Sequence, residues 1–339
     1  MSKRKLSKRQ HQRIQSIQNR RRKNVDVKQY LNDKAVESLD GLGAEVSGTV
    51  ITNYGSQVDI EGNTEPFADK IVRCFVRANI PALVTGDKIV WRPAEPQGVV
   101  VALEPRQSEL IRPDNYGKLR PVAANIDLIA VVFAVQPTPK SNLLDRYLVA
   151  AEAKGIEPFL VLNKTDLIGQ DQPDIDSIRQ CYESIGYRVI SVSAQNNDGM
   201  DELKTYITNK NCIFVGQSGV GKSSLINQLV PENNSAVGAL SEATNEGTHT
   251  TTASKLIHLD TGGVIIDSPG IREFSLTHLD KETIIYGFKD FRPFLGHCKF
   301  RDCNHENDDG CALVDAVAAG KLLQHRLDNY RQIINSLDI

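Results

Sequence analysis

Long apolar segments are absent from this chain of 339 residues. No run approaches the roughly 18 apolar residues that a membrane-spanning helix needs, and the first residues lack the apolar core of a signal peptide. Cysteine is scarce, with six residues, which excludes a chain held together by disulfide bonds. These absences exclude the membrane and secreted classes, so we expect a cytoplasmic protein that makes no membrane contact.

Acidic residues are absent before Asp26, in a stretch that carries ten lysine and arginine residues. The net charge of the whole chain is only −2, so the rest of the sequence is acidic. Basic arms with interspersed Gln and Asn are typical of segments that bind phosphate backbones and become ordered on binding. We predict that residues 1–35 form a disordered, RNA-binding tail; the alternative is a solvated tail without a partner.

Short alternating segments separated by glycines follow, as in Gln57–Ile60 and Asp87–Arg92. This pattern indicates a small barrel, and an OB-type barrel of about five strands fits residues 36–112. Four basic residues lie in the alternating segments Lys70–Arg77 and Asp87–Arg92. They form either a basic RNA-binding face or ordinary strand surface: Arg73, Arg77, Lys88 and Arg92.

The pattern changes to alternating strands and helices over residues 113–280. Ile126–Val135 is apolar except for Asp127, as in a buried parallel strand, and Leu143–Ala151 has a helical pattern. The next strand, Pro158–Leu162, leads directly into Asn163. This alternation predicts an α/β domain with a doubly wound parallel sheet.

A phosphate-binding loop lies between a predicted strand, Cys212–Val215, and a predicted helix. Glycines let backbone N–H groups surround a phosphate, and the helix presents its positive end. Lys222 is expected to bridge the β- and γ-phosphates and assist catalysis, and Ser223 to bind Mg²⁺. The predicted contacts of this loop with GTP are Gly216, Gln217, Ser218, Gly219, Val220, Gly221, Lys222, Ser223 and Ser224.

A guanine-reading motif, Asn163-Lys164-Thr165-Asp166, follows the strand that ends at Leu162. The Asp166 carboxylate can accept hydrogen bonds from N1–H and the exocyclic amine of guanine, a pair that adenine cannot supply. Ser193 and Ala194, at the end of the next strand, fit the element whose backbone N–H meets the guanine carbonyl. The sequence therefore favours GTP over ATP.

Two switch segments are expected to sense the γ-phosphate. Asp267-Ser268-Pro269-Gly270 fits the DxxG element, in which Asp267 holds Mg²⁺ through water and the Gly270 N–H meets the γ-phosphate. Residues 247–252 lie where the first switch belongs, and Thr251 is the preferred Mg²⁺ ligand, with Thr250 the alternative.

Glutamine is absent after the DxxG element, where Ras-like enzymes use it to orient the attacking water. Ile271 occupies that position and cannot bond to water. We predict that His249 in the first switch takes this role, and that a partner accelerates a slow reaction. The alternative is a loop histidine without a chemical role.

A metal-binding pattern lies within residues 281–339. Cys298-x₄-Cys303-x-His305-x₅-Cys311 supplies three thiolates and one imidazole, a complete tetrahedral set for one structural Zn²⁺ per chain. His297 adjoins the first cysteine, but the spacing favours His305. A helical segment is predicted from Ala312 to about Leu337, so this region is expected to be a zinc-binding domain with helices.

The order of the motifs is reversed: the guanine-reading motif precedes the phosphate-binding loop. Such an order predicts a circularly permuted P-loop GTPase domain, placed between the barrel and the zinc-binding domain. We hypothesise that the permutation couples the second switch directly to the zinc-binding domain, so that hydrolysis shifts this domain on its RNA.

In this combination and order, the motifs resemble those of the RsgA (YjeQ) family, the ribosome small-subunit-dependent GTPases of bacteria. The resemblance covers nearly the whole chain. It implies a monomer that binds the small (30S) ribosomal subunit and its 16S rRNA, acts late in subunit maturation, and hydrolyses GTP faster on the ribosome. The residues on family motif positions are Asn163, Lys164, Asp166, Lys222, Ser223, Asp267, Cys298, Cys303, His305 and Cys311.

Two other functions remain open from the sequence. One is a nucleotide-dependent RNA-binding module in which hydrolysis is incidental, and the other is a P-loop kinase or ATPase. Strong stimulation of hydrolysis by small subunits distinguishes the GTPase from the first, and a loss of GTP binding in Asp166→Asn distinguishes it from the second.

Overall fold

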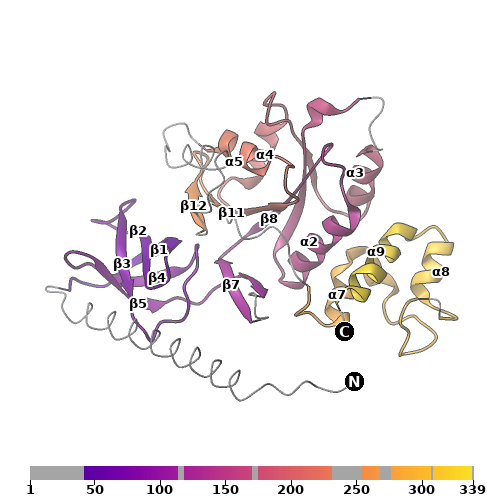
Figure 1. Ribbon diagram of the computed structural model, residues 1–339, viewed down its shortest axis with the longest axis horizontal. Helices are drawn as coiled ribbons and strands as arrows, with labels where there is room; N and C mark the ends of the chain where they lie inside the picture. The colour runs from indigo at the N-terminus through magenta and orange to yellow at the C-terminus, as the bar shows by residue number, and fades with distance from the viewer. Residues whose placement is uncertain are drawn as a thin grey trace, which may run out of the picture. The chain divides into compact units, whose positions relative to one another are not determined.

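The computed structural model describes residues 42–113, 118–169, 175–230, 254–267, 276–306 and 308–337. The predicted basic tail, residues 1–35, lies outside them. The described residues fall into two compact units. One unit runs to Leu83 and includes Asp87–Pro105, and the other comprises Val84–Gly86 and the chain from Arg106 onward (Figure 1).

The first unit is a closed barrel, which confirms the predicted OB-type fold. Its strands are β1 (Val46–Asn53), β2 (Gln57–Gly62), β3 (Ile71–Val76), β4 (Lys88–Arg92) and β5 (Gly98–Leu103). The strand β1 pairs with both β2 and β4, β2 pairs with β3, and β5 pairs with β3 and β4. Only the β3–β5 pair is parallel among them, and the pairing of β4 with β1 closes the barrel.

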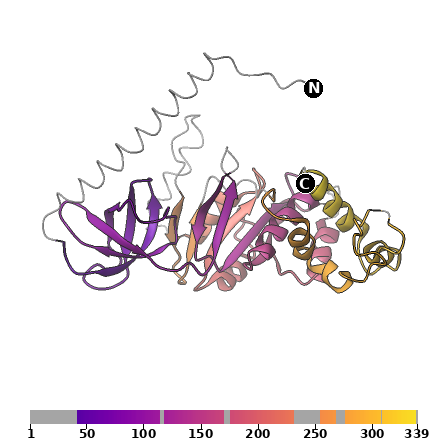
Figure 2. The same ribbon diagram turned by 90° about the horizontal axis from the view of Figure 1, so that it is seen from below.

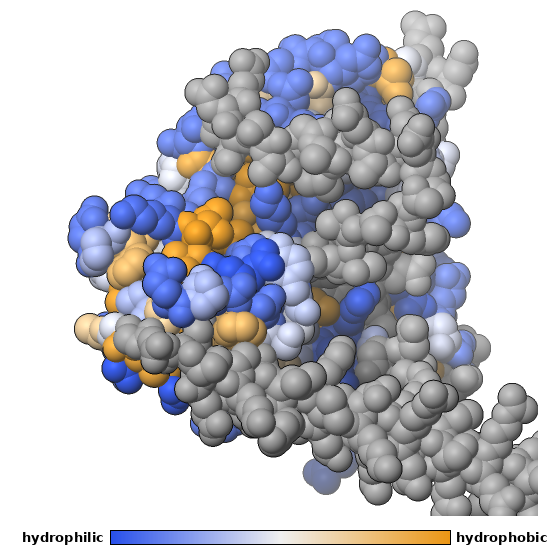
Figure 3. All heavy atoms as spheres, turned by 60° about the vertical axis from the view of Figure 1, so that its left-hand side comes forward, coloured by the Kyte–Doolittle hydropathy of each residue, from blue (hydrophilic) through white to orange (hydrophobic). Residues whose placement is uncertain are grey.

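Alternating side chains fill the barrel. Ile60, Cys74 and Trp91 are fully buried, and Phe67 meets the Trp91 ring edge-on at 5.1 Å between ring centres. On the outside, hydrophobic residues are interspersed with hydrophilic ones (Figure 3). Tyr54 and Ile71 are large hydrophobic side chains of the barrel unit that are exposed.

Two of the four basic residues predicted on the barrel surface have intramolecular partners. The Arg73 guanidinium forms an ion pair with Asp59 and lies 4.4 Å from the centre of the Tyr54 ring. The Arg92 guanidinium donates hydrogen bonds to the carbonyl oxygens of Gly43 and Leu42. Arg73 nevertheless remains accessible on the β2–β3 surface, whereas Arg92 serves the barrel's own backbone.

The second unit contains the predicted α/β sheet, with strand order β10-β9-β8-β11-β13-β12. The strands are β8 (Leu128–Ala134), β9 (Glu157–Asn163), β10 (Val189–Ser191), β11 (Asn211–Gly216), β12 (Lys255–His258) and β13 (Val264–Asp267). All neighbours pair in parallel except β12, which is antiparallel to β13. A separate antiparallel pair, β6 (Glu109–Pro113) and β7 (Leu119–Ala124), precedes the sheet.

Helices cover both faces of this sheet. They are α2 (Ser141–Ala153), α3 (Ile175–Ser184), α4 (Met200–Ile207) and α5 (Lys222–Leu229), with the 3₁₀ turn η1 (Thr165–Leu167). Successive residues of β8 point to opposite faces. Ile129 packs with α2 in one core, whereas Ala130 packs with α4 and α5 in the other. The buried strands are apolar throughout because both of their faces are covered.

The C-terminal segment packs on α2, in the same core as one face of the sheet (Figures 1 and 2). Its elements are α7 (Lys281–Gly287), η2 (Lys289–Phe294), α8 (Ala312–Ala318) and α9 (Gln324–Asn335). Phe288 stacks on Phe291, and Tyr330 of α9 meets both rings edge-on. The helical segment predicted over Ala312–Leu337 is two helices, because Gly320 adopts a left-handed φ of +67° after α8.

No helix among the described residues combines the length and the apolar character that crossing a membrane requires.

Candidate functional site

The phosphate-binding loop connects β11 to α5 and depends on three glycines in conformations that other residues rarely adopt. Gly216, Gly219 and Gly221 have φ values of +145°, +82° and +90°. A Cβ atom on Gly216 would lie 2.1 Å from the carbonyl oxygen of Val132, in the neighbouring strand β8. The loop therefore packs closely on the sheet and leads into the positive end of α5, which begins at Lys222.

The charge of Lys222 acts on the carboxyl group of Asp267. The Lys222 ammonium donates hydrogen bonds to the carbonyl oxygens of Gly216, at 2.7 Å, and Gln217, at 2.9 Å. Asp267 ends β13, and burial raises the pKa of its carboxyl group while the Lys222 charge lowers it. Two residues predicted to act on the phosphates and on Mg²⁺ are thus brought together, one from the start of α5 and the other from the end of β13.

The Asn163 side chain joins the guanine-reading and phosphate-binding motifs. Asn163 ends β9 and is 1% exposed. Its amide nitrogen donates to the carbonyl oxygen of Val220, at 2.9 Å, and its amide oxygen accepts from the Ala194 N–H, at 3.3 Å. A second link comes from Lys164, whose ammonium donates to the carbonyl oxygen of Gly219 at 2.7 Å.

The Ser193 side chain orients Asp166. Its hydroxyl group donates to the Asp166 carboxylate and accepts from the Asn196 N–H at 3.2 Å. The Ser193 N–H itself donates to the carbonyl oxygen of Asp198. Sequence reasoning assigned Ser193 a backbone role toward guanine and missed this side-chain contact, since no local pattern relates Ser193 to Asp166.

A cavity of about 410 Å³ connects the two motifs. Its lining residues are Asn163, Lys164, Asp166, Leu167, Ala194, Gln195, Gly221 and Ser224. This volume falls within the range of roughly 300–1,000 Å³ that is typical of small-molecule sites. A cavity of about 550 Å³ beside the cysteine cluster is larger, but it contains no residue of either nucleotide motif.

Of the remaining residues predicted to bind GTP or act on it, some belong to the described part of the chain and the others do not. Thr165 begins η1 and its N–H donates to the carbonyl oxygen of Val192, at 3.2 Å. Ser218 and Ser223 are exposed at the phosphate-binding loop and the start of α5. The predicted switch residues lie outside the described part of the chain: His249, Thr250, Thr251, Gly270 and Ile271.

The structure brings the four predicted metal ligands together. The ligand atoms of Cys298, Cys303, His305 and Cys311 all lie within 4.8 Å of one another. Nδ1 of His305 is 3.6, 3.6 and 3.5 Å from the sulfur atoms of the three cysteines, in chain order. Zinc bond lengths in a tetrahedron predict a nitrogen–sulfur separation of about 3.6 Å. The cluster therefore has the shape of a metal site, and the exposed His297 is not part of it.

Backbone contacts hold the ligands in place. His305 has a left-handed φ of +60°, and the Asp308 carboxylate accepts from the Asn304 N–H at 2.9 Å. The Ala312 N–H donates to the Cys298 sulfur at 3.4 Å. The carbonyl oxygen of His305 accepts from Arg331 on α9 at 3.0 Å, which ties the cluster to that helix.

Known proteins resemble this chain over nearly its whole length. The RsgA GTPase family model matches residues 103–277. A relative from Ectopseudomonas mendocina, named small ribosomal subunit biogenesis GTPase RsgA, is 50% identical over 99% of this chain and 98% of its own. A relative of the same name from Hahella chejuensis is 49% identical over 99% of this chain and 97% of its own.

Two solved structures share the fold. YjeQ from Thermotoga maritima is 29% identical, with a TM-score of 0.70, over 87% of this chain and 99% of that one. YloQ, described as a circularly permuted GTPase, is 28% identical, with a TM-score of 0.67, over 88% of this chain and 97% of that one. The reversed motif order is therefore a circular permutation, as predicted. The chain belongs to the RsgA GTPase family and is a GTP hydrolase.

Proposed function

We propose that this GTPase hydrolyses GTP to GDP and phosphate on the small ribosomal subunit, late in the maturation of that subunit. The observation that carries the nucleotide assignment is the Asn163 side chain, which links the guanine-reading and phosphate-binding motifs around one cavity. The assignment of the subunit is supported by the names of relatives about half identical over nearly the whole chain. Such a role places the protein in the cytoplasm.

The Asp166 carboxylate is the group that selects guanine. A carboxylate has about four lone-pair positions, so Asp166 can accept from Ser193 and still accept from N1–H and the exocyclic amine of guanine. Because Ser193 fixes the carboxylate, little side-chain freedom is lost when the base binds. Adenine would leave the carboxylate without those donors, which explains the preference for GTP.

The phosphate-binding loop and Lys222 hold the phosphates. Lys222 now bonds to carbonyl oxygens of its own loop, and we expect phosphate oxygens to replace them as its partners. Ser223 and Asp267 are the described residues that would hold Mg²⁺, and Thr251 would complete the set. When bound, Mg²⁺ neutralises charge that develops on the phosphates.

Catalysis requires a group in place of the missing glutamine. Ile271 cannot orient water, so we propose that His249 orients or deprotonates the attacking water. Both residues lie outside the described part of the chain. A histidine in a switch segment also gives the subunit a means of control, since subunit binding can bring it to the γ-phosphate.

The C-terminal cluster fits one structural Zn²⁺ held by Cys298, Cys303, His305 and Cys311. Four protein ligands leave no position for a reacting water, so the metal would stabilise the fold of residues 297–312. We further propose that the monomer contacts 16S rRNA, and that the ten basic residues before Asp26 contribute through the phosphate backbone.

The test is GTP turnover of the full chain, alone and with each purified ribosomal subunit. We expect slow hydrolysis alone and strong stimulation by the small subunit only. In His249→Ala, stimulation should be lost while subunit binding is retained. Equal stimulation by both subunits would refute the subunit assignment. The absence of any stimulation would refute it too, and is the result expected of an RNA-binding module in which hydrolysis is incidental. Stimulated hydrolysis that survives in His249→Ala would refute the catalytic role of His249.

A further inference from the structure

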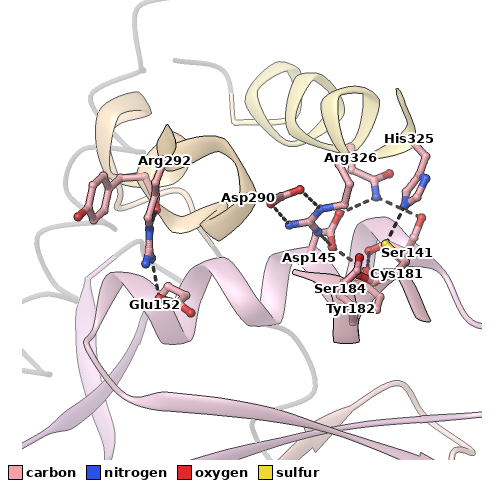
Figure 4. Close-up of polar contacts among 12 residues, drawn as sticks. Ser141, Asp145, Glu152, Cys181, Tyr182, Ser184, Asp290, Arg292, His325 and Arg326 are labelled. Carbon is pink, nitrogen blue, oxygen red and sulfur yellow. Dashed lines mark hydrogen bonds and ion pairs between the residues drawn. The ribbon is translucent and has the colours of Figure 1, made fainter. Parts of the chain in front are cut away.

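A buried ionic network joins the C-terminal helix α9 to helix α2 of the GTPase sheet (Figure 4). Arg326 of α9 is 1% exposed, and its guanidinium bonds to the fully buried Asp145 of α2. The same guanidinium makes two hydrogen bonds with Asp290 of η2, at 3.0 and 2.8 Å. One arginine therefore connects three elements that lie far apart in the sequence.

Neighbouring groups complete the hydrogen bonding of Asp145. The Tyr182 hydroxyl donates to one carboxylate oxygen at 2.7 Å, and the Asn329 amide donates to the other at 2.6 Å. The rings of Tyr182 and Phe288 lie 5.6 and 4.8 Å from the guanidinium carbon. Buried charges are tolerated only when they are paired and fully hydrogen-bonded. The network consequently permits one orientation of α9 on α2 and penalises others.

Further contacts concentrate on the first half of α2. The Asn329 amide also donates to the Ser141 hydroxyl oxygen at 3.1 Å, and the Asn142 amide donates to the carbonyl oxygen of Asn329 at 3.2 Å. Arg146 donates to the Ser336 hydroxyl oxygen at 2.6 Å. Helix α9 thus holds the first turn of α2, where the helix follows the loop of residues 135–140.

That loop packs against the phosphate-binding loop. A Cβ atom on Gly219 would be 3.7 Å from Cδ of Pro137. A cavity of only about 10 Å³ remains between the loops, and its lining includes Pro137 and Pro139 from one loop and Gln217 and Val220 from the other. Strand pairing reinforces this proximity, since Gly216 lies opposite Val132 near the end of β8. A shift of the first turn of α2 would therefore disturb the phosphate-binding loop.

We propose that Arg326 and Asp145 are positioning residues for nucleotide binding, through which the C-terminal helix holds α2 and the phosphate-binding loop in the binding conformation. The connection runs through α2, and each contact named for it lies between described residues. It is therefore separate from the coupling through the second switch that the motif order suggests. The C-terminal segment and the sheet behave as one body, and nucleotide affinity depends on their contact.

The chain offers a matched control on the same helix. Arg292 of η2 bonds to Glu152 of α2 at 2.6 Å, between partly exposed side chains. Glu152 is seven residues beyond Asp145, so this ion pair is about 10 Å farther along α2, away from the phosphate-binding loop. Both ion pairs join α2 to the C-terminal segment, but only the first lies near the start of the helix.

The experiment compares Arg326→Lys and Asn329→Ala with the controls Arg292→Lys and Glu152→Gln in the full chain. Dissociation constants for GDP and steady-state kcat and KM for GTP are measured on protein shown to be folded by circular dichroism. We expect roughly fivefold to tenfold higher GDP dissociation constants and KM values in the first pair, with kcat unchanged, and changes below about twofold in the controls.

A purely structural role predicts another result. Partial unfolding would lower kcat through a smaller active fraction and leave KM unchanged, which would overturn the proposal. Nucleotide affinity within twofold of the parent in both test variants, or an equal loss in the controls, would overturn it too. If Arg326→Lys does not fold, Asn329→Ala and Ser141→Ala decide the question, because each removes an uncharged side chain and leaves the ion pair of Arg326 and Asp145 in place.

Discussion

Gly221, the last glycine of the phosphate-binding loop, leaves no room for a side chain. A Cβ atom on it would lie 2.4 Å from Nδ2 of Asn163, and its φ is +90°. The Asn163 amide cannot move aside freely, because it is buried and bonds to both Val220 and Ala194. We therefore predict that Gly221→Ala disturbs the guanine-reading and phosphate-binding motifs together.

The magnitude follows from two contributions. A side chain in the left-handed conformation costs about 1–2 kcal/mol. Separating the buried Asn163 amide from its carbonyl partner costs about 1–3 kcal/mol more. The free loop relaxes to avoid both, and nucleotide binding must restore its shape. We expect GDP binding to weaken by about 2–5 kcal/mol, which is roughly 30-fold to several thousand-fold in the dissociation constant.

Gly219→Ala is the matched control in the same loop. Its φ of +82° gives similar backbone strain, but among the described residues the sole atom within 4 Å of an added Cβ would be Cδ of Pro137, at 3.7 Å. Strain alone predicts a loss of about 1–2 kcal/mol, or roughly fivefold to thirtyfold. Titration of both full-length variants with a fluorescent GDP analogue measures the difference. Equal affinities in two folded variants would refute the argument that the collision with Asn163 matters.

Three further predictions concern the guanine contact, the metal and the buried ion pair. Asp166→Asn should weaken GTP binding by roughly 100-fold or more without lowering the melting temperature, as competition titrations can measure. Chelation of the metal, or Cys311→Ser, should lower the melting temperature, with one metal equivalent released from the parent in a colorimetric assay. Arg326→Met should lower the unfolding free energy in urea by about 3–5 kcal/mol, because it leaves buried carboxylates unpaired. Arg188→Ala, which breaks a pair about half exposed on both sides, should cost less than about 1 kcal/mol.

The nucleotide site is predictable from the sequence because each part is a short continuous segment at a strand end. Asn163 ends β9 and Gly216 ends β11, and parallel strands place their carboxyl ends at one edge of a sheet. Their proximity follows from the alternation of strands and helices alone. The roles of His249, Thr251 and Gly270 stay predictions, since the described residues do not include them.

The hydrogen-bond partners of the side chains inside the site are less predictable. The Ser193 hydroxyl bonds to Asp166, 27 residues away, and the Asn163 amide bonds to the carbonyl oxygen of Val220, 57 residues away. Such contacts depend on how two loops fold over one strand edge. The single helix predicted over Ala312–Leu337 was also wrong in detail. The apolar pattern continues past Gly320, but the chain turns there and forms two helices.

By itself, the sequence displayed the motifs of this protein: the guanine-reading motif, the phosphate-binding loop, the four candidate metal ligands and the reversed motif order. These features depend on residue type and short spacing, which a linear chain displays directly. Only the tertiary structure decided how the C-terminal segment is held. Arg326 and Asp145 are 181 residues apart, and each taken alone is an ordinary charged residue of a helix. They pair because packing buries both side chains, and a buried charge requires an opposite charge beside it.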